Sequence, residues 1–400
     1  MPSIRFHGFD NDWEQRKLGD DLVSIHTGTN LLGSITNTGM PLIKMGNIQR
    51  GYFDTSKVEF LAENEQLDKA DIANYGDFFF NTRNTLELVG KGATWMKNSG
   101  EYAFNSNIAR FELRNLDTIF FNYLYNTDYM TKQIHARAMG TTSVAAIYPR
   151  TLDSVEYLAP CMKEQQKIGA YFKQLDHLIT LHQRKFEKLT NVKKSMLEKM
   201  FPKDGADVPE VRFKGFTGVW EQRKAKELFV STADKGYPEL PVLSATQDRG
   251  MIRRDENSIN IFHDKKNEAG YKRVLPGQFV IHLRSFQGGF AHSAIEGITS
   301  PAYTVFGFSE PEKHDSEYWK YVFTSKAFIR RLETVTYGIR DGRSISYDEF
   351  LTLSFVYPSR SEQTAIAQYL DKLSNLITLH QCELEKFQNL KKALLEKMFV

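Results

Sequence analysis

The sequence predicts a mixed α/β (α+β) fold built from two similar units, with two long helices that pair as an antiparallel coiled coil. Three observations support this prediction. A short segment at the start of the chain recurs just past its middle, and a longer segment with a heptad apolar pattern occurs before the middle and again at the end. The stretches between these segments mix strand-like and helix-like patterns. A chain of 400 residues also exceeds the usual size of one hydrophobic core.

The repeated segments show that the chain is a duplication. Residues 1–17, MPSIRFHGFDNDWEQRK, align with residues 208–224, VPEVRFKGFTGVWEQRK, and end on the same five letters. Residues 163–201 align without a gap onto residues 361–399, at an offset of 198 positions. The unit is therefore constant at its ends and variable in its middle, and it is not the short repeat of a solenoid.

The long repeated segments predict helices of a coiled coil. Apolar residues recur every seven positions, and the only glycine, Gly169, lies near a start. At about 1.5 Å per residue each helix would be about 58 Å long. Pro202 is expected to end the first helix. The expected core positions of the pair are Ile168, Leu175, His182, Leu189, Ile366, Leu373, His380 and Leu394.

The two histidines among these positions are the central residues of their segments. In an antiparallel pair about a pseudo-two-fold axis, His182 and His380 would face each other, since packed helices lie about 8–10 Å apart. We interpret them as a polar pair that fixes the register of the seam. Metal binding by this pair is the alternative. A further apolar stripe on both helices predicts contact with the globular parts or with another subunit.

The variable middles, residues 18–160 and 225–359, predict one domain each. Short apolar and aromatic runs bounded by Gly, Asn and Pro indicate strands, as in PLIKMGNI, DFFFNTR, QFVIHLR, VEYLAP and LSFVYP. Residues 116–138 and 315–335 carry helical spacing instead. Each middle is therefore expected to pack a sheet against helices.

Composition and missing motifs exclude several classes of function. The net charge of +3 does not by itself indicate a nucleic-acid-binding protein. No apolar run is long enough for a membrane span, and the N-terminus lacks a signal peptide. Cys161 and Cys382 do not occupy matching places in the repeats, which favours a reducing, cytoplasmic location over a disulfide framework. No phosphate-binding loop, amino-methyltransferase signature or metal cluster occurs, so we expect no catalytic site.

Two blocks each occur twice in closely related forms: FKGFTGVWEQRK, with FHGFDNDWEQRK as its first copy, and the helix pattern EQ…LITLHQ…LKKALLEKMF, which ends in VKKSMLEKMF in its first copy. Together they resemble the specificity subunit of a type I restriction-modification system, and the resemblance covers essentially the whole chain. It implies an order of domains along the chain. These are a first target recognition domain at 1–160 with its repeat segment 2–17, a central conserved helix at 161–201, a linker at 202–208, a second target recognition domain at 209–359 with its repeat segment 209–224, and a C-terminal conserved helix at 360–400.

The resemblance also implies a function in phage defence. Each target recognition domain would read one half of a bipartite site in double-stranded DNA. The helices would set the spacing of the halves and dock two methyltransferase subunits. The complex would methylate adenine at N6 or, with motor-nuclease subunits added, cut unmodified DNA. S-adenosylmethionine, ATP and Mg²⁺ would then belong to the partner subunits and no cofactor or metal to this chain.

Two alternatives stay open at this stage. One is a coiled-coil scaffold whose globular domains bind proteins and not DNA. The other is the recognition subunit of a defence system that only methylates. The parts that would separate these readings belong to other chains.

Candidate DNA contacts follow from residue type, because Arg pairs with guanine and Asn or Gln with adenine. Faint similarity between the halves places Arg50 and Arg249 in corresponding turns and Arg83 and Arg284 at the ends of corresponding strands. One matched loop differs in side chains, which suits recognition. The expected DNA-binding residues are Arg50, Arg83, Thr141, Thr142, Ser143, Arg249, Arg284, Arg340 and Arg343. Weaker candidates for phosphate contact are Lys91, Lys97, Lys272 and Arg273. For each of them a solvated charge or a local ion pair is the alternative.

Overall fold

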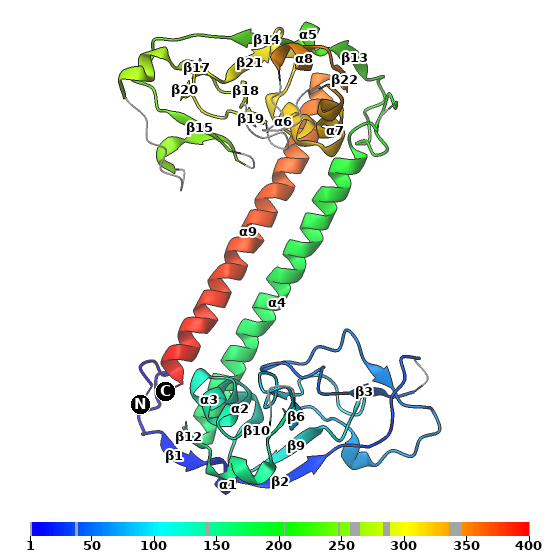
Figure 1. The fold of residues 1–400 in the computed structure, drawn as a ribbon, viewed down its shortest axis with the longest axis vertical. Coiled ribbons are helices and arrows are strands. Elements are labelled where there is room, and N and C mark those ends of the chain that lie inside the picture. The colour runs from blue at the N-terminus through cyan, green and yellow to red at the C-terminus, as the bar shows by residue number, and fades with distance from the viewer. Residues whose placement is uncertain are drawn as a thin grey trace. The chain divides into compact units, whose positions relative to one another are not determined.

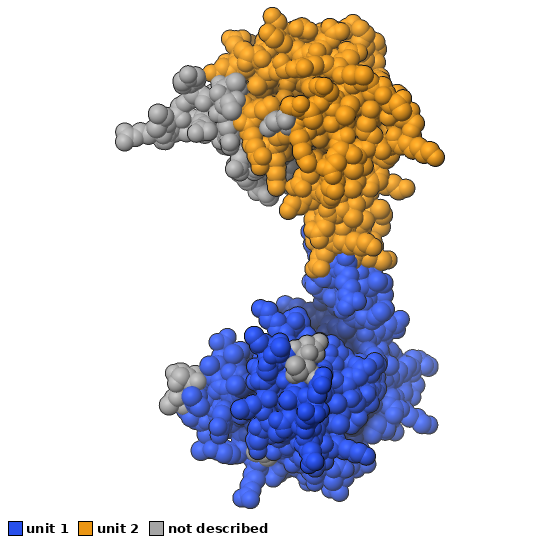
Figure 2. All heavy atoms as spheres, turned by 90° about the vertical axis from the view of Figure 1, so that its right-hand side faces the viewer, with its two compact units in different colours: residues 1–184, 381–400 blue, residues 185–380 orange. Residues whose placement is uncertain are grey.

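The computed structural model describes residues 2–36, 39–140, 144–203, 205–246, 249–256, 265–282, 289–335 and 346–399. The chain divides into two compact units, residues 1–184 with 381–400 and residues 185–380 (Figure 2). Helices α4 (Met162–Lys199) and α9 (Arg360–Met398) are the two long helices, and each contributes to both units (Figure 1). The mixed α/β fold with two domains and two long helices is confirmed.

The first unit is built on a four-stranded antiparallel sheet of order β2-β9-β5-β7. Its strands are β2 (Leu22–Thr27), β9 (Ile108–Leu113), β5 (Phe78–Asn81) and β7 (Gly92–Thr94). Two smaller sheets have the orders β4-β3-β8 and β10-β11-β6. Their strands are β3 (Pro41–Ile43), β4 (Glu59–Phe60), β8 (Ala103–Phe104), β6 (Arg83–Asn84), β10 (Met139–Gly140) and β11 (Ala145–Ala146). Helices α2 (Thr118–Tyr125) and α3 (Asp128–His135) follow the large sheet.

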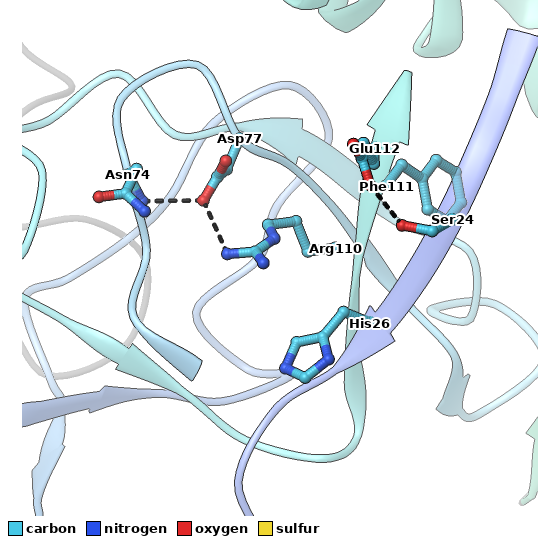
Figure 3. Close-up of a pocket in the computed structure, with 7 residues that line it drawn as sticks. All are labelled: Ser24, His26, Asn74, Asp77, Arg110, Phe111 and Glu112. Atoms are coloured by element: carbon cyan, nitrogen blue, oxygen red, sulfur yellow. Dashed lines mark hydrogen bonds and ion pairs between the residues drawn. The ribbon is translucent and has the colours of Figure 1, made fainter. Parts of the chain in front are cut away.

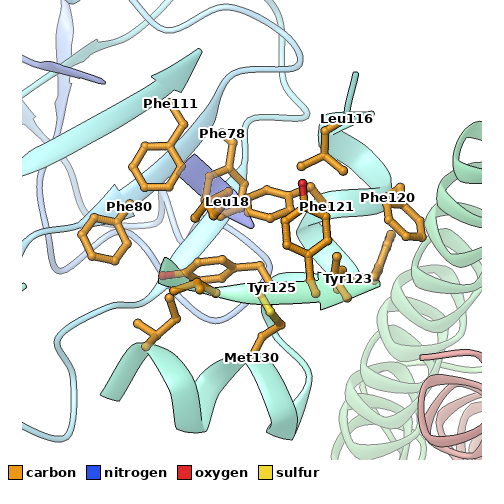
Figure 4. Packing of buried hydrophobic residues seen from close by; sticks show 14 of the residues in the cluster. Leu18, Phe78, Phe80, Phe111, Leu116, Phe120, Phe121, Tyr123, Tyr125 and Met130 are labelled. Carbon is orange, nitrogen blue, oxygen red and sulfur yellow. The ribbon is translucent and has the colours of Figure 1, made fainter. Parts of the chain in front are cut away.

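The three consecutive phenylalanines of β5 place this strand between two cores. Successive side chains of a strand point to opposite faces. Phe78 and Phe80 face α2, where the ring of Phe78 lies 4.7 Å from that of Phe121 (Figure 4). Phe79 faces the other side and lies 4.8 Å from the ring of Phe104. All three are fully buried, so the strand predicted at DFFFNTR holds the two layers of this unit together.

The second unit repeats this plan. Its large antiparallel sheet has the order β14-β21-β18-β19, which corresponds strand for strand to the first. The strands are β14 (Phe229–Thr232), β21 (Thr304–Phe308), β18 (Phe279–Ile281) and β19 (Phe290–His292). Two-stranded sheets are formed by β15 (Leu243–Thr246) with β16 (Gly250–Arg253) and by β17 (Lys272–Val274) with β20 (Gly297–Thr299). The helices are α6 (Ser316–Thr324), α7 (Lys326–Val335) and α8 (Tyr347–Leu351).

The helical spacing over 116–138 and 315–335 is confirmed, with one difference in each unit. Both predicted segments form two short helices and not one. Thr127 caps the start of α3 through its side chain, since its hydroxyl accepts a bond from the backbone N–H of Met130. Ser325 accepts a bond from the backbone N–H of Phe328 at the start of α7 in the same way.

The N-terminal segment meets the end of α9 in the first unit. The backbone N–H groups of Ser3 and Ile4 donate to the carbonyl of Lys397 at 2.9 and 3.3 Å. In the second unit the N–H of Val211, the match of Ile4, donates to the carbonyl of Lys199 at 2.9 Å. In the first unit this contact therefore joins segments from opposite ends of the sequence. In the second unit the two bonded residues are joined directly by the short linker that follows α4.

The start of α4 approaches α2 so closely that one side chain must be missing. A Cβ atom added at Gly169 would lie 2.9 Å from the backbone nitrogen of Phe120 and 3.3 Å from Asp117 Oδ1. The matching position on α9 is Ala367, which is buried and carries the methyl group that Gly169 lacks.

We expect Gly169→Ala to destabilise the first unit, although alanine favours helices by about 1 kcal/mol. The new methyl group meets backbone and not a flexible side chain, and such overpacking costs roughly 1–3 kcal/mol. Urea unfolding of the full chain measures this. The matched change Ala367→Gly should also destabilise, by roughly 0.5–1 kcal/mol, for the opposite reason. A gain in stability from Gly169→Ala would contradict the packing described here.

Candidate DNA interface and the repeated clamp

Each unit holds its repeated N-terminal segment against the start of a long helix with a buried ion pair. Arg5 donates through Nε and Nη2 to the two carboxylate oxygens of Glu164 at 3.0 and 2.7 Å. Arg212 donates in the same way to Glu362 at 2.8 and 2.6 Å. Both glutamates are buried, and each raises the pKa of its arginine through these bonds. Paired parallel bonds fix orientation as well as distance, and we call each of these ion pairs a clamp.

The glutamine after each clamp glutamate links the helix start to the variable domain of its own unit. Gln165 Oε1 accepts a bond from the backbone N–H of Asp117 at 2.9 Å, and Gln363 accepts one from Asp315 at 2.9 Å. Each glutamine also donates at 2.9 Å to the carbonyl of the proline five residues before it. Asp117 and Asp315 are the N-caps of α2 and α6. The repeated letters EQ therefore join three segments of each unit.

The repeated letters WEQRK form a strand that anchors the variable domain. Strand β1 (Glu14–Lys17) pairs with β12 (Glu156–Ala159), and β13 (Glu221–Lys224) pairs with β22 (Ser354–Tyr357), both antiparallel. The partner strands lie directly before the long helices. Short helices α1 (Leu18–Asp21) and α5 (Ala225–Leu228) follow the repeated strands. Both repeated tryptophans, Trp13 and Trp220, are buried beneath these strands. Each variable domain thus begins and ends on one shared two-stranded base.

A second repeated contact shows that the long helices run antiparallel within each unit. In the first, Lys391 on α9 binds Asp176 on α4 at 2.6 Å and lies 5.4 Å above the ring of Tyr123. In the second, Lys193 on α4 lies 5.7 Å above the ring of Tyr321, which matches Tyr123. Burial raises the pKa of both tyrosines, in the case of Tyr321 to about 12. Lysine and tyrosine at these repeated positions therefore place the far end of one helix beside the start of the other.

The predicted coiled-coil positions fall into two groups. Ile168, Leu175, Ile366 and Leu373 are buried near the helix starts, where the globular domains add to the contact. Leu189 and Leu394 are half-buried.

The ring of His182 lies 5.5 Å from that of Phe387. His182 belongs to the first unit and His380 to the second, so their expected approach stays a prediction.

Three of the arginines expected to contact DNA lie in the described residues. Arg50 stands in the turn that follows β3, half-buried, with Nη2 3.1 Å from His135 Nε2. Arg83 is exposed on β6, which pairs with β11. Arg249 is exposed just before Gly250, in the turn between β15 and β16. All three belong to turns or short strands outside the large sheets. The other expected contacts lie outside the described residues: Thr141, Thr142, Ser143, Arg284, Arg340 and Arg343.

The weaker candidates for phosphate contact differ in their surroundings. Lys272 Nζ donates to the carbonyl of Tyr303 at 2.6 Å, and Arg273 binds Glu296 at 2.5 Å. Both are engaged within their own unit. Lys97 donates to the hydroxyl of Thr55. Lys91 donates at 2.8 Å to an amide oxygen and pairs with no described carboxylate.

A polar hollow of about 270 Å³ lies over β2 and β9 of the first unit (Figure 3). Its charged groups have partners inside the unit. Arg110 Nη1 lies 3.4 Å from Asp77 Oδ2, and Ser24 donates to Glu112 at 2.6 Å. His26 lies 2.8 Å from Asp71. The carboxylates in and around this hollow make it an unsuitable place for a DNA phosphate.

The described residues contain neither a candidate metal cluster nor a membrane-spanning helix. No three His, Cys, Asp or Glu side chains come together there as a possible metal site. No helix in that part of the chain is both long and apolar enough to cross a bilayer.

The duplicated architecture matches that of known proteins. Residues 10–191 match the sequence profile of the type I restriction modification DNA specificity domain. The chain is 22% identical over 409 residues to the type I restriction enzyme MjaVIII specificity subunit of Methanocaldococcus jannaschii, which covers 96% of this chain and 91% of that one. The fold matches the crystal structure of the type I restriction-modification S subunit from M. genitalium with a TM-score of 0.60 at 14% identity, over 100% of this chain and 99% of that one. These matches identify a type I restriction modification DNA specificity domain in residues 10–191, and the whole chain has the fold of that S subunit.

A shorter match gives the same family. The putative type I restriction enzyme MjaX specificity subunit of the same organism is 27% identical over 202 residues, which are 48% of this chain and 46% of that one. Specificity subunits are a non-catalytic family. The clamps and the repeated strands are the constant frame to which the two variable domains are attached.

We expect Arg212→Ala to destabilise the second unit by about 3–5 kcal/mol, because it leaves the buried carboxylate of Glu362 without its cation. Urea unfolding of the full chain measures the loss. Arg223→Ala is the control, since Arg223 makes an exposed pair with Glu221 worth at most about 1 kcal/mol. Replacing the whole pair, as in Arg212→Met with Glu362→Leu, should recover most of the stability. Equal losses in the free energy of unfolding from Arg212→Ala and Arg223→Ala would show that the clamp stabilises the unit no more than an exposed ion pair does.

We expect His314→Leu to weaken the loss of stability at acid pH. Burial lowers the pKa of His314, so the unfolded chain binds the proton more readily and stability falls as the pH drops below about 6.5. Leu116 is the matching residue of the first unit and is also buried, which shows that leucine fits this frame. Urea unfolding at about pH 7.5 and about pH 5.5 tests this, with His7→Leu at an exposed site as the control. An unchanged difference between the two pH values in His314→Leu would contradict it.

Proposed function

We propose that this chain selects the DNA sequence for a type I restriction-modification complex by reading one half of a bipartite site with each variable domain. The domains of the first and second units would be its two target recognition domains. The long helices would set the unread distance between the halves and dock two methyltransferase subunits. The complex would methylate adenine at N6 or, with motor-nuclease subunits, cut unmodified DNA. S-adenosylmethionine, ATP and Mg²⁺ would be bound by those partners.

The observation that supports this proposal most strongly is that one set of framework contacts occurs twice and holds a different variable domain each time. The clamps, the linking glutamines and the base strands match residue by residue between the units. The turns and short strands farther from this base differ in their side chains. The constant framework residues are suited to contacts with methyltransferase subunits, which are the same for both units. Variable side chains on this shared framework are suited to reading two different half-sites.

The dimensions of the helices support a spacing role. Helix α4 has 38 residues and α9 has 39, so each is about 57 Å long at about 1.5 Å per residue. One turn of duplex DNA is about 34 Å, and proteins with two reading elements place them about one turn apart or more. A helix pair of this length is therefore sufficient to separate two half-sites.

Sequencing of methylated adenines in a host that carries the chain with its methyltransferase partner tests the proposal. We expect a motif that depends on this gene, with two short fixed blocks around a spacer of constant length. Exchange of residues 18–160 for another variable domain should change one block only. Exchange of residues 225–359 is the matched control and should change the other.

Three outcomes would count against parts of the proposal. Changes in both blocks from one exchange would contradict separate reading. An assembled complex that adds no methylation would favour the protein-binding scaffold. Methylation without any restriction of incoming DNA would identify a system that only methylates.

A further inference from the structure

A group of basic and polar side chains gathers beside the turn after β3 in the first unit. Its members are Gln49, Arg50, Lys91 and His135, and we call them the basic cluster. We propose that the basic cluster binds a backbone phosphate of the DNA, and that it positions the first domain without reading a base. This inference rests on the proposed function and assigns it a site in the first domain.

The turn that carries two members of the cluster is held rigidly. The backbone N–H of Gln49 donates to the carbonyl of Tyr52 at 2.9 Å, and Gly51 takes a positive φ of 81°. Gly51 also donates its N–H to the carbonyl of Gly92 at 3.0 Å and accepts a bond from Asn122 at 3.1 Å. The turn is thereby fixed to both β7 and α2. A fixed turn can present charge at one place with little loss of entropy on binding.

The cluster brings two cations together without an acidic partner. Within the described part of the chain no Asp or Glu forms an ion pair with Arg50 or Lys91, and both are half-buried. Burial lowers the pKa of Lys91, the charge of Arg50 lowers it further, and the carboxylate of Glu87 acts in the opposite direction without forming an ion pair. Two neighbouring positive charges repel each other. An anion beside them would be attracted by both and would offset their repulsion. Phosphate is the anion that DNA offers at regular spacing.

His135 holds Arg50 in this position. A guanidinium has donors only, so His135 Nε2 is the acceptor in its contact with Arg50 Nη2 at 3.1 Å. Arg50 Nη1 also lies 3.5 Å from the hydroxyl of Thr131. These contacts use part of the five N–H donors of a guanidinium and leave the others for a ligand.

Gln49 is held in a way that argues against reading a base. Its Oε1 accepts the bond from Lys91 Nζ at 2.8 Å, and its Nε2 donates to the carbonyl of Gly46 at 2.9 Å. Recognition of adenine by glutamine uses both ends of the amide at once. Because both ends are engaged inside the protein, Gln49 acts as a positioning residue for Lys91. The cluster therefore offers positive charge but no free amide that could read a base, and such a group is suited to a phosphate.

The second unit has the matching turn but not the cluster. Arg249 corresponds to Arg50 and is exposed. Gly289 stands directly before β19 as Lys91 stands directly before β7. Glu333 occupies the position in the sequence that matches His135. The second unit therefore has neither a lysine nor a histidine at the two matching positions, so this cluster is not repeated there residue for residue.

Binding of the full chain, co-expressed with the methyltransferase subunit, to a duplex with the recognised site and to an unrelated duplex tests this proposal. We expect Lys91→Met and Arg50→Ala each to weaken binding to both duplexes and to lower the slope of log Kd against log salt by about one. Arg50→Lys should stay close to the parent, since a phosphate needs charge and not a planar fork. Lys69→Met removes an exposed lysine of the same unit and is the control, and thermal unfolding verifies that each variant is folded.

Each other outcome has a distinct meaning. A loss confined to the recognised duplex, with Arg50→Lys as weak as Arg50→Ala, would overturn the phosphate contact and make Arg50 a base reader. Binding and salt slopes equal to the parent in both variants would overturn the site altogether. In either case DNA binding by the parent leaves the proposed function standing. Failure of the parent chain to bind any duplex would instead refute the proposed function.

Discussion

A carboxylate removed from water must be met by a cation and by further donors, and this requirement governs both units. Glu164 and Glu362 are buried at the starts of the long helices, where Arg5 and Arg212 from the repeated segments reach them with two bonds each. Without its arginine, each helix start would hold a buried charge at a cost of several kcal/mol. The N-terminal segment, the helix start and the variable domain must therefore fold together.

The same requirement explains why the constant residues are polar as well as apolar. An apolar contact of equal area would hold the helix start with less directional precision, because burial of apolar surface does not depend on orientation. Two parallel bonds from a guanidinium and the two ends of a glutamine amide fix direction. For a subunit whose two domains must stand in a defined relation to their base strands, direction matters as much as stability.

The variable domains show how much can change on such a base. Both keep one strand order in their large sheets and the same pair of helices after it. Individual side chains differ between them: Lys91, directly before β7, and His135, at the end of α3, are matched by Gly289 and Glu333. Charge can therefore be added to one domain without disturbing the core, since the rings of each core are contributed by the sheet and the helices.

The sequence by itself determined the duplication, the two long helices and the strands at five apolar or aromatic runs, because periodicity and repetition are local properties of a chain. Residue type alone also marked Arg50 and Lys91 as candidate DNA contacts, since both carry a positive charge. Only the tertiary structure decided what RF, EQ and WEQRK do, because Arg5 and Glu164 lie 159 positions apart and no local pattern pairs them. The same holds for the basic cluster, where His135 and Gln49 come from separate elements and acquire a role only by packing against one turn.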